Sequence, residues 1–239
     1  MRNSRTVAVF MVILVSHQKV AVKNRPRRLK AWHDSFPAMS EAKPLRFAVT
    51  GGIGCGKSAT GDALKSLGVA VVDSDDLTHD LLAGDAEVHA AIRARFGETV
   101  FSQGKVNRRA LGAVIFADPA ARTDLEAILH PRIRALTDEW LASQPATQAA
   151  AVIIPLLYEV GRDKDFAIAV SVACSPATQS ERLKQRGWSE AEISRRLGAQ
   201  LPTEEKVKRA QGVIWTEGAL ENHAEQWRLV MPSLGGRLA

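Results

Sequence analysis

The chain has 239 residues, of which 46% are apolar and 24% are charged, so it is long and apolar enough for a globular α/β domain with a sizeable insertion and is not a disordered chain. Its net charge of +6 belongs to the first 38 residues, which hold eight of the 32 lysines and arginines and one of the 26 acids. The remaining chain has 24 basic and 25 acidic residues. The charge therefore does not predict a nucleic-acid-binding face.

An apolar run near the N-terminus, Val7–Val15, follows two arginines and resembles the start of a signal peptide. The run has nine residues, whereas a membrane-spanning helix needs about 20, and no small-x-small cleavage site follows it. We therefore expect residues 1–43 to be an N-terminal extension, either disordered or the product of a mis-assigned start with translation beginning at Met39. The sequence predicts no contact with a membrane.

The first predicted strand covers Leu45–Thr50, and apolar residues at helical spacing predict a helix over Ser58–Leu67. Between them the sequence fits G-x-x-x-x-G-K-[ST], the P-loop pattern, in which backbone N–H groups and a helix N-terminus bind phosphates and the serine binds magnesium. A glycine-rich turn with an unrelated lysine would rarely reproduce the whole motif in this context. We predict that ATP contacts Gly52, Ile53, Gly54, Cys55, Gly56, Lys57, Ser58 and Ala59, and that Ser58 is also a ligand of Mg²⁺.

Cys55 and Cys174 are the two cysteines of the chain, and they do not form a C-x-x-C pair. This count and spacing indicate neither a zinc site nor a disulfide framework, and they favour a cytoplasmic protein. Cys55 lies beside a helix N-terminus, which would lower the pKa of its thiol. We interpret it as a small residue in a variable loop position, with no catalytic role.

Two acids follow the second predicted strand, Val69–Val72. Asp73 and Asp75 are two residues apart, so they would point the same way if the strand continued. The carboxyl edge of an open parallel sheet is where ligands bind. We therefore expect at least one of these carboxylates in the site.

The stretch from Leu77 to about Ala142 has a helical pattern, interrupted at Arg95–Leu111 by a segment with two glycines. No strong strand pattern occurs in the rest of this stretch. We predict a mostly helical, substrate-binding insertion over about residues 77–149.

Apolar runs typical of strands return after the insertion, at Ala151–Glu159, Phe166–Ala173 and Gly212–Trp215. Strands that alternate with helices predict an α/β fold with a parallel sheet, here a three-layer core of the P-loop NTPase type. We assign the core to residues 44–76 and 150–239, within one domain over residues 44–239.

A pair of basic helices is predicted between the last two strands, over about residues 175–200, with a break at Gly187. Arg182 and Arg186 are four residues apart and therefore share a helix face. One interpretation is a solvated helix whose arginines pair with nearby glutamates. The other, which we favour beside a P-loop, is a lid whose arginines neutralise a transferring phosphoryl group.

Further motifs separate the classes of P-loop protein. The chain lacks the N-K-x-D run with which GTPases specify their base. The strand pattern at Ala151–Glu159 contains Pro155 and ends in a single acid, unlike the paired acids of motor ATPases. A short chain with these features suits a kinase of small molecules.

From about Leu45 to Leu220 the sequence resembles the dephospho-coenzyme A kinase family. The resemblance lies in the order and spacing of several stretches, namely TGGIGCGKS (Thr50–Ser58), VVDSD (Val71–Asp75), GKVNRRAL (Gly104–Leu111), LEAILHP (Leu125–Pro131), PLLYE (Pro155–Glu159) and QSERLKQR (Gln179–Arg186), followed by Gln200 and Lys206. It implies a P-loop core with a helical insertion and a lid. It also implies transfer of the γ-phosphoryl group of ATP, with Mg²⁺, to the ribose 3′-hydroxyl of dephospho-coenzyme A, the last step of coenzyme A synthesis.

The resemblance also implies roles for individual residues. Lys57 would contact the β- and γ-phosphates, and Asp75 would accept the proton of the attacking hydroxyl, whereas Asp73 would be a cap or an outer partner of the metal. Arg182 or Arg186 would close over the donor. Arg108 would reach the acceptor's phosphates, and His130 is either a hydrogen-bonded structural histidine or a substrate contact. The sequence does not predict an oligomeric state.

Three positions depart from the family's pattern. Ala59 stands where the family often has threonine, Gln211 replaces an aspartate, and Thr216 stands at the position of an asparagine. If the last two frame the adenine, nucleotide binding would change. Two other functions therefore stay open, a P-loop kinase of another nucleoside or small alcohol, and a nucleotide-sensing module without turnover.

Overall fold

The computed structural model describes residues 45–219 and 221–234. The expected N-terminal extension, residues 1–43, and the start at Met39 lie outside them. None of the helices in the described ranges is long and apolar enough to cross a membrane.

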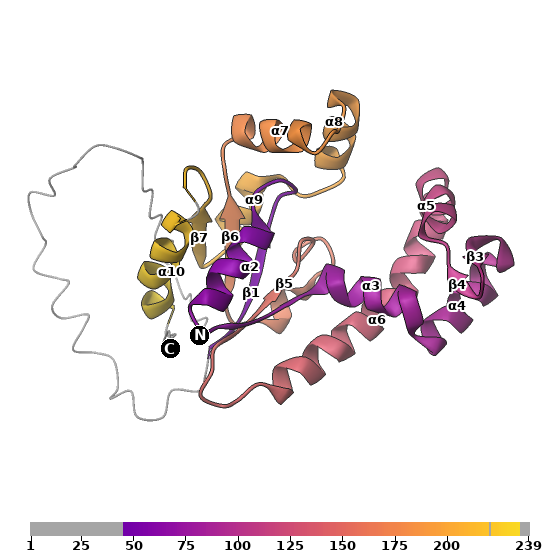
Figure 1. Cartoon of the computed structure of the whole chain (residues 1–239), viewed down its shortest axis with the longest axis horizontal. Coiled ribbons are helices and arrows are strands. Elements are labelled where there is room, and N and C mark those ends of the chain that lie inside the picture. Colours follow the sequence, from indigo (N-terminus) through magenta and orange to yellow (C-terminus); the bar gives the residue numbers. More distant parts are fainter. Residues whose placement is uncertain (1–44, 220, 235–239) are drawn as a thin grey trace, which may run out of the picture.

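A five-stranded sheet forms the centre of the molecule, in the order β2-β5-β1-β6-β7 (Figure 1). Its strands are β1 (Arg46–Gly51), β2 (Ala70–Asp73), β5 (Ala150–Ile153), β6 (Ala169–Ala173) and β7 (Gly212–Trp215). Every pairing is parallel, and Val49 in the central strand is aligned with Ile153 on one side and Val170 on the other. Strands β5 and β6 are buried along their whole length, as strands covered on both faces must be. The predicted parallel α/β sheet is confirmed.

Helices cover both faces of the sheet and make it the middle of three layers. Helices α2 (Lys57–Ser66) and α10 (Glu221–Ser233) pack together on one face, where the Phe47 and Trp227 ring centroids are 5.7 Å apart. The next residue of β1, Ala48, faces a second apolar cluster with Leu157 and Phe166. Helix α9 (Thr203–Arg209) packs against β1 and β6, and the sequence analysis does not predict this helix.

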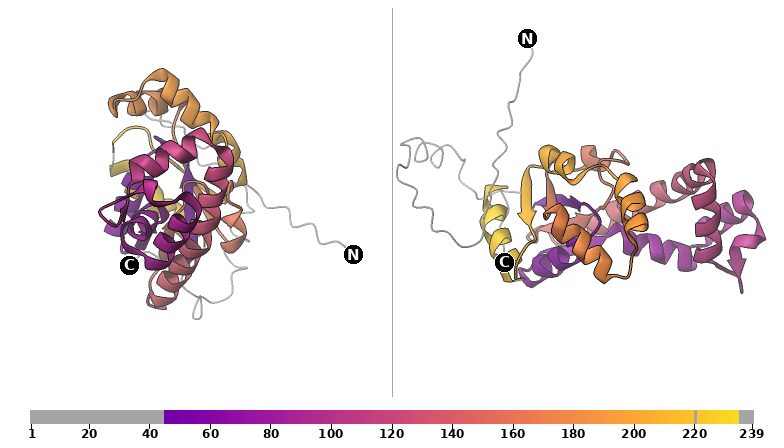
Figure 2. Two further views of the ribbon diagram at one scale, coloured as in Figure 1. Left: turned by 90° about the vertical axis from the view of Figure 1, so that its right-hand side faces the viewer. Right: turned by 90° about the horizontal axis from the view of Figure 1, so that it is seen from above.

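The segment between β2 and β5 is mostly helical and extends from one side of the sheet (Figures 1 and 2). It consists of α3 (Ser74–Gly84), α4 (Ala86–Phe96), the 3-10 turn η1 (Glu98–Val100), β3 (Phe101–Ser102), β4 (Lys105–Val106), α5 (Arg108–Ala117) and α6 (Pro119–Ser143). It has an apolar core of its own, which includes Ile92, Leu111 and Leu125. The glycine-containing interruption is a hairpin, in which β3 and β4 pair antiparallel around Gln103 and Gly104.

Two strand predictions are too long at their ends. The run Ala151–Glu159 leaves the sheet after Ile153, because Pro155 has no N–H to donate, and residues up to Gly161 form turns. The run Phe166–Ala173 begins its strand at Ala169, after the 3-10 turn η2 (Arg162–Asp165).

Two short helices above the sheet form the lid segment, α7 (Pro176–Gln185) and α8 (Glu190–Gly198) (Figure 1). Each begins at a serine whose side chain accepts a hydrogen bond from a helical N–H, which satisfies a donor that the helix leaves free. Gly187 lies between them at φ +83°, a left-handed conformation that glycine adopts without strain.

Candidate active site

The P-loop joins the central strand β1 to helix α2 at the carboxyl edge of the sheet. Gly54 and Gly56 have φ values of +78° and +90°, so a side chain at either position would be strained. Gly56 is also the N-cap of α2, so the loop runs directly into the positive end of the helix dipole. Backbone N–H groups at such a terminus form a binding site for anions such as phosphate.

Lys57 lies along this loop. Its Nζ donates to the carbonyl oxygens of Gly51 and Gly52, at 3.0 and 3.1 Å. Burial lowers the pKa of the Lys57 ammonium, because the charged form has lost water. Ser58, one residue further, is exposed.

Side chains from three distant segments hold the P-loop from outside. Gln179 of α7 donates to the carbonyl oxygen of Ile53 at 2.7 Å, and the Ile53 N–H donates to the side chain of Gln200 at 3.2 Å. Thr216, after β7, donates to the carbonyl oxygen of Cys55 at 2.7 Å. The sequence places Thr216 only conditionally, as a residue that could frame the adenine, and it predicts no role for Gln179 or Gln200, although both belong to the stretches that match the family.

Asp73 and Asp75 do not lie on one strand, because β2 ends at Asp73 and α3 begins at Ser74. The strand does not continue, so the condition under which the two carboxylates would point the same way is not met. Asp73 Oδ1 accepts a hydrogen bond from the Asp75 N–H at 2.9 Å and caps the helix. Asp73 is partly buried, and Asp75, in the first turn of α3, is exposed on one side, yet the partial loss of water raises the pKa of both carboxyls.

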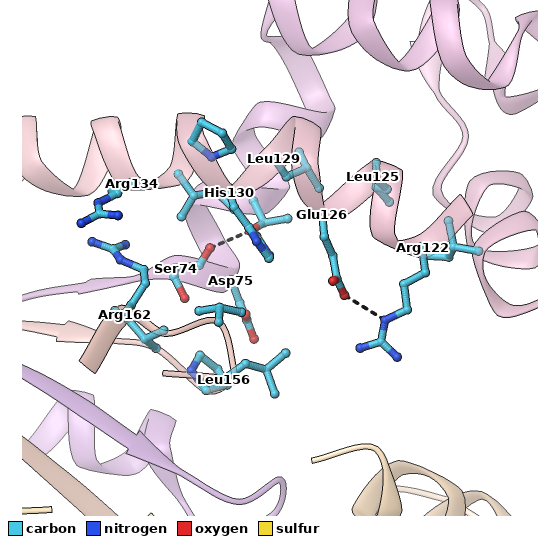
Figure 3. Close-up of a pocket in the computed structure, with 17 residues that line it drawn as sticks. Ser74, Asp75, Arg122, Leu125, Glu126, Leu129, His130, Arg134, Leu156 and Arg162 are labelled. Carbon is cyan, nitrogen blue, oxygen red and sulfur yellow. Dashed lines mark hydrogen bonds and ion pairs between the residues drawn. The ribbon is translucent and has the colours of Figure 1, made fainter. Parts of the chain in front are cut away.

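A cavity of about 490 Å³ opens beside Asp75, between α3, α6 and the turns that follow β5 (Figure 3). Its walls are largely apolar, with Ile115, Leu129 and Leu156 among them, and three arginines lie at its margins. His130, from the middle of α6, also lines it, and Figure 3 shows its ring in the same part of the pocket as Asp75. A concave, mostly apolar cavity with a few convergent polar groups is the usual form of a small-molecule site.

Comparison with known proteins agrees with this combination of P-loop, strand-end acids and cavity. The family model for dephospho-CoA kinase matches residues 45–222. The chain belongs to the dephospho-CoA kinase family.

Curated relatives support the assignment across most of the chain. A dephospho-CoA kinase of Synechococcus sp. (strain CC9902) is 36% identical over 184 residues, which cover 76% of this chain and 92% of that protein. One of Anaeromyxobacter dehalogenans (strain 2CP-C) is 41% identical and covers 79% of this chain and 92% of its own length.

Solved structures agree on the fold. The structure of TT1252 from Thermus thermophilus has a TM-score of 0.71 at 34% identity and covers 81% of this chain and all of its own. A dephospho-CoA kinase from Campylobacter jejuni has a TM-score of 0.55 at 24% identity, over 79% of this chain and 96% of its own.

The lid arginines differ in their surroundings. Arg182 donates from Nη1 to the Thr216 hydroxyl at 3.0 Å and from Nη2 to the Thr216 carbonyl oxygen. Arg186 is exposed at the C-terminal end of α7. Arg195 of α8 lies over the Phe116 ring of α5, 5.1 Å from its centroid, so the lid contacts the insertion.

Arg108 and His130 belong to different helices of the insertion, α5 and α6. Arg108 is exposed at the start of α5, its Nη2 is 2.9 Å from Nε2 of His79, and it lies outside the cavity lining. His130 is exposed, and within the described residues its ring has no hydrogen bond. The interpretation of His130 as a hydrogen-bonded structural residue therefore has no support in the described contacts.

The two C-terminal departures from the family pattern lie at opposite edges of the sheet. Gln211 precedes β7, and its Oε1 accepts from the Ala169 N–H at 2.7 Å, at the amino edge away from the P-loop. Thr216 follows β7 at the carboxyl edge and contacts the P-loop directly. Of these two, only Thr216 is therefore placed to affect phosphate binding.

Proposed function

We propose that this chain transfers the γ-phosphoryl group of ATP to the ribose 3′-hydroxyl of dephospho-coenzyme A, which gives coenzyme A and ADP. The observation that carries the proposal is the position of Asp75. The Asp75 carboxylate lines the cavity. Burial raises the pKa of Asp75, and the positive charge of Lys57 in the P-loop acts in the opposite direction and lowers it. One residue therefore borders both the phosphate loop and the cavity for an acceptor.

The donor phosphates would bind the N–H groups from Gly52 to Lys57. Lys57 would leave its two carbonyl partners and bind the β- and γ-phosphates. Because burial has removed water from the ammonium, a negatively charged phosphate stabilises it more than the neutral carbonyl oxygens do. Charge neutralisation of this kind contributes most of the catalysis in phosphoryl transfer. Ile53, Cys55 and Ala59 would take part through the loop backbone.

The site suits a magnesium ion held mainly by the nucleotide. The exposed Ser58 hydroxyl, in the first turn of α2, offers one oxygen ligand, and Asp73 lies at the same edge of the sheet. Magnesium usually binds through one or two protein oxygens, with phosphates and water completing the shell. Such an ion supplies positive charge to the transferring phosphoryl group.

The acceptor would occupy the cavity, with its hydroxyl at Asp75. Burial keeps the pKa of Asp75 above its ordinary value, which makes the carboxylate a better proton acceptor near neutral pH. His130 would contact the acceptor inside the cavity, and Arg108 would reach its phosphates from α5. Arg182 and Arg186 would complete the site from the lid.

The test is ADP formation by the full chain with and without dephospho-coenzyme A, with Lys57→Ala as the inactive control. We expect ADP release that depends on this acceptor and on Mg²⁺, and loss of both ATP affinity and turnover in the variant. Preference for another nucleoside or alcohol in an acceptor panel would assign a different kinase. ATP binding without turnover on any acceptor would assign a nucleotide-sensing module.

A further inference from the structure

Thr216 follows the last residue of β7 and is fully buried, and its hydroxyl makes hydrogen bonds to two other segments. It donates to the carbonyl oxygen of Cys55 at 2.7 Å, a shorter contact than that to the carbonyl oxygen of Ala173 at 3.3 Å, and it accepts from Arg182 Nη1 at 3.0 Å. A hydroxyl has one proton to donate and two lone pairs, so it can make both bonds at once. The Thr216 N–H is tied to the carbonyl oxygen of Ala173 at 2.8 Å, which fixes the backbone that carries the hydroxyl.

The bond to Cys55 fixes the orientation of one peptide group in the P-loop. In a trans peptide the C=O of Cys55 and the N–H of Gly56 point in opposite directions. Because the carbonyl points outward to Thr216, the Gly56 N–H points to the inner side of the loop. No acceptor for this N–H is found within residues 45–219 and 221–234.

Gly56 packs closely against the side chain of Thr216. A Cβ on Gly56 would lie 3.2 Å from the Thr216 hydroxyl oxygen and 3.3 Å from its Cβ. Gly56 also has a left-handed φ of +90°. Thr216 thus packs directly on the residue whose N–H it orients.

The second bond fixes the lid arginine. Arg182 donates from both terminal nitrogens to Thr216, one to the hydroxyl and one to the carbonyl oxygen. A guanidinium has five N–H donors in a rigid plane, so two bonds to one residue define its orientation and leave other donors for a ligand. Gln179, from the same helix, donates to the carbonyl oxygen of Ile53 in the P-loop. Helix α7 is therefore connected to the loop directly through Gln179 and indirectly through Arg182 and Thr216.

We propose that Thr216 is a positioning residue that couples Arg182 of the lid to the P-loop, and that this coupling determines ATP affinity. The proposal rests on the function proposed above, and it concerns a position at which the chain departs from the asparagine of its family. A threonine hydroxyl both donates and accepts, so it can make the two contacts that an amide would otherwise divide between its oxygen and nitrogen.

The variants Thr216→Val and Thr216→Ser separate the hydroxyl from the rest of the side chain. Valine keeps the shape and removes the hydroxyl, which leaves a buried carbonyl and an arginine N–H without their partner. We expect a loss of ATP affinity of about 10-fold by calorimetry, the size of one to two hydrogen bonds. The same rise should appear in the KM for ATP, with the KM for dephospho-coenzyme A unchanged. Thr216→Ser should restore ATP affinity to within about 3-fold.

A matched control is Thr60→Val, another fully buried threonine whose hydroxyl has no hydrogen-bond partner within the described residues. It should leave ATP affinity unchanged. Arg182→Ala tests the other side of the contact, and Thr216→Val should have a smaller effect in that background than alone, because the shared interaction is already lost. If Thr216→Val does not fold, the Arg182→Ala and Thr216→Ser variants decide alone.

Unchanged ATP affinity in Thr216→Val, or in Arg182→Ala, would overturn the proposal. So would a serine variant as weak as the valine variant, or a parallel loss of affinity for ATP and for the acceptor with a lower melting temperature. ATP binding is measured without an acceptor, so wild-type protein that binds ATP but does not phosphorylate dephospho-coenzyme A would contradict the proposed function and leave this test valid.

Discussion

Two neighbouring carboxylates, Asp73 and Asp75, have different environments although they are two residues apart. Asp73 uses its oxygen to cap α3, a bond that stabilises the start of the helix. Asp75 lines the cavity and is influenced by the charge of Lys57. This difference predicts different effects of the same substitution at the two positions.

Asp75→Asn should lower turnover by about 10²- to 10⁴-fold, the usual range for a lost general base, and leave ATP affinity near wild type. Asp75 acts as a base when deprotonated, and burial raises its pKa, so wild-type kcat should fall as pH drops through that raised pKa. This acidic limb should be absent in the variant. The pH profile of kcat and ATP calorimetry measure both effects.

Asp73→Asn is the comparison, and it should change turnover and stability little, because asparagine caps a helix about as well as aspartate does. If Asp73→Asn proves the more damaging to turnover in a folded protein, the two roles are reversed. A small, pH-independent loss in Asp75→Asn would make Asp75 an orienting group, because a dissociative transition state demands little proton removal.

At the scale of elements, the lid is anchored at both ends by acidic side chains from other segments. Glu217 accepts bonds from the Ser175 N–H and the Thr178 hydroxyl at the start of α7, at 2.9 Å each. Glu159 accepts from the Leu201 N–H after α8 and pairs with the buried Lys206 of α9 at 2.8 Å. Both anchors are open to tests of stability.

Glu217→Gln should lower the free energy of unfolding by about 1–3 kcal/mol at pH 7, since hydrogen bonds to a charged group are lost. Hydrogen bonds from Ser175 lower the pKa of Glu217 to about 2, from an ordinary value of 4.5. A depressed pKa stabilises the folded state above about pH 4.5, and this contribution is lost as the pH falls toward 2. The gap between wild type and variant should therefore narrow below pH 4.5 in urea titrations.

The control for this pH series is Glu225→Gln, which removes an exposed partner of Arg228 on α10 and should cost about 0–1 kcal/mol. A gap for Glu217→Gln that stays constant between pH 7 and pH 3 would contradict the assigned role of its charge.

Lys206→Met should destabilise the protein by about 3–5 kcal/mol, because it leaves Glu159 and the carbonyl oxygen of Pro155 without their buried partner. Lys208→Met is a matched control on the same helix, since Lys208 pairs with Glu205 but its side chain is 69% exposed. That change should leave the free energy of unfolding nearly unchanged, because an exposed ion pair contributes little to stability. Urea denaturation of both variants checks the prediction, and costs within 1 kcal/mol of each other would contradict it.

At the scale of the whole molecule, the lid and the insertion approach the sheet from different directions and contact each other (Figure 2). The contact is between Arg195 and Phe116, whose side chain is 68% exposed. Ile115, the neighbour of Phe116, lines the cavity. This contact therefore joins the lid segment to a wall of the cavity that we propose for the acceptor.

Phe116→Ala should raise the KM for dephospho-coenzyme A by about 2- to 5-fold, the equivalent of an exposed cation–π contact of about 0.5–1 kcal/mol. Arg195→Ala should have a similar effect, and the double variant should be no worse than either single variant. Leu229→Ala, at an equally exposed apolar residue on α10, should leave kinetics unchanged. Additive effects in the double variant would mean that the two side chains act separately.

The sequence by itself determined the P-loop, the parallel α/β class and the family. Each depends on residues close together in the chain: the P-loop motif has a fixed spacing, and buried parallel strands are continuous apolar runs. Local patterns left open whether the strand continues to Asp75, because this boundary depends on one bond, the cap that Asp73 provides for α3.

Only the tertiary structure decided how the site is supported. Thr216 contacts Cys55 across 161 residues of sequence, and Lys206 contacts Pro155 across 51. These contacts exist because β7 lies two strands from the P-loop strand β1, with β6 between them, and α9 packs against β1 and β6, an order that no spacing in the sequence encodes. The sequence marked Thr216 as a departure from its family, and the fold shows that its hydroxyl lies on the P-loop because parallel strands bring their carboxyl ends together.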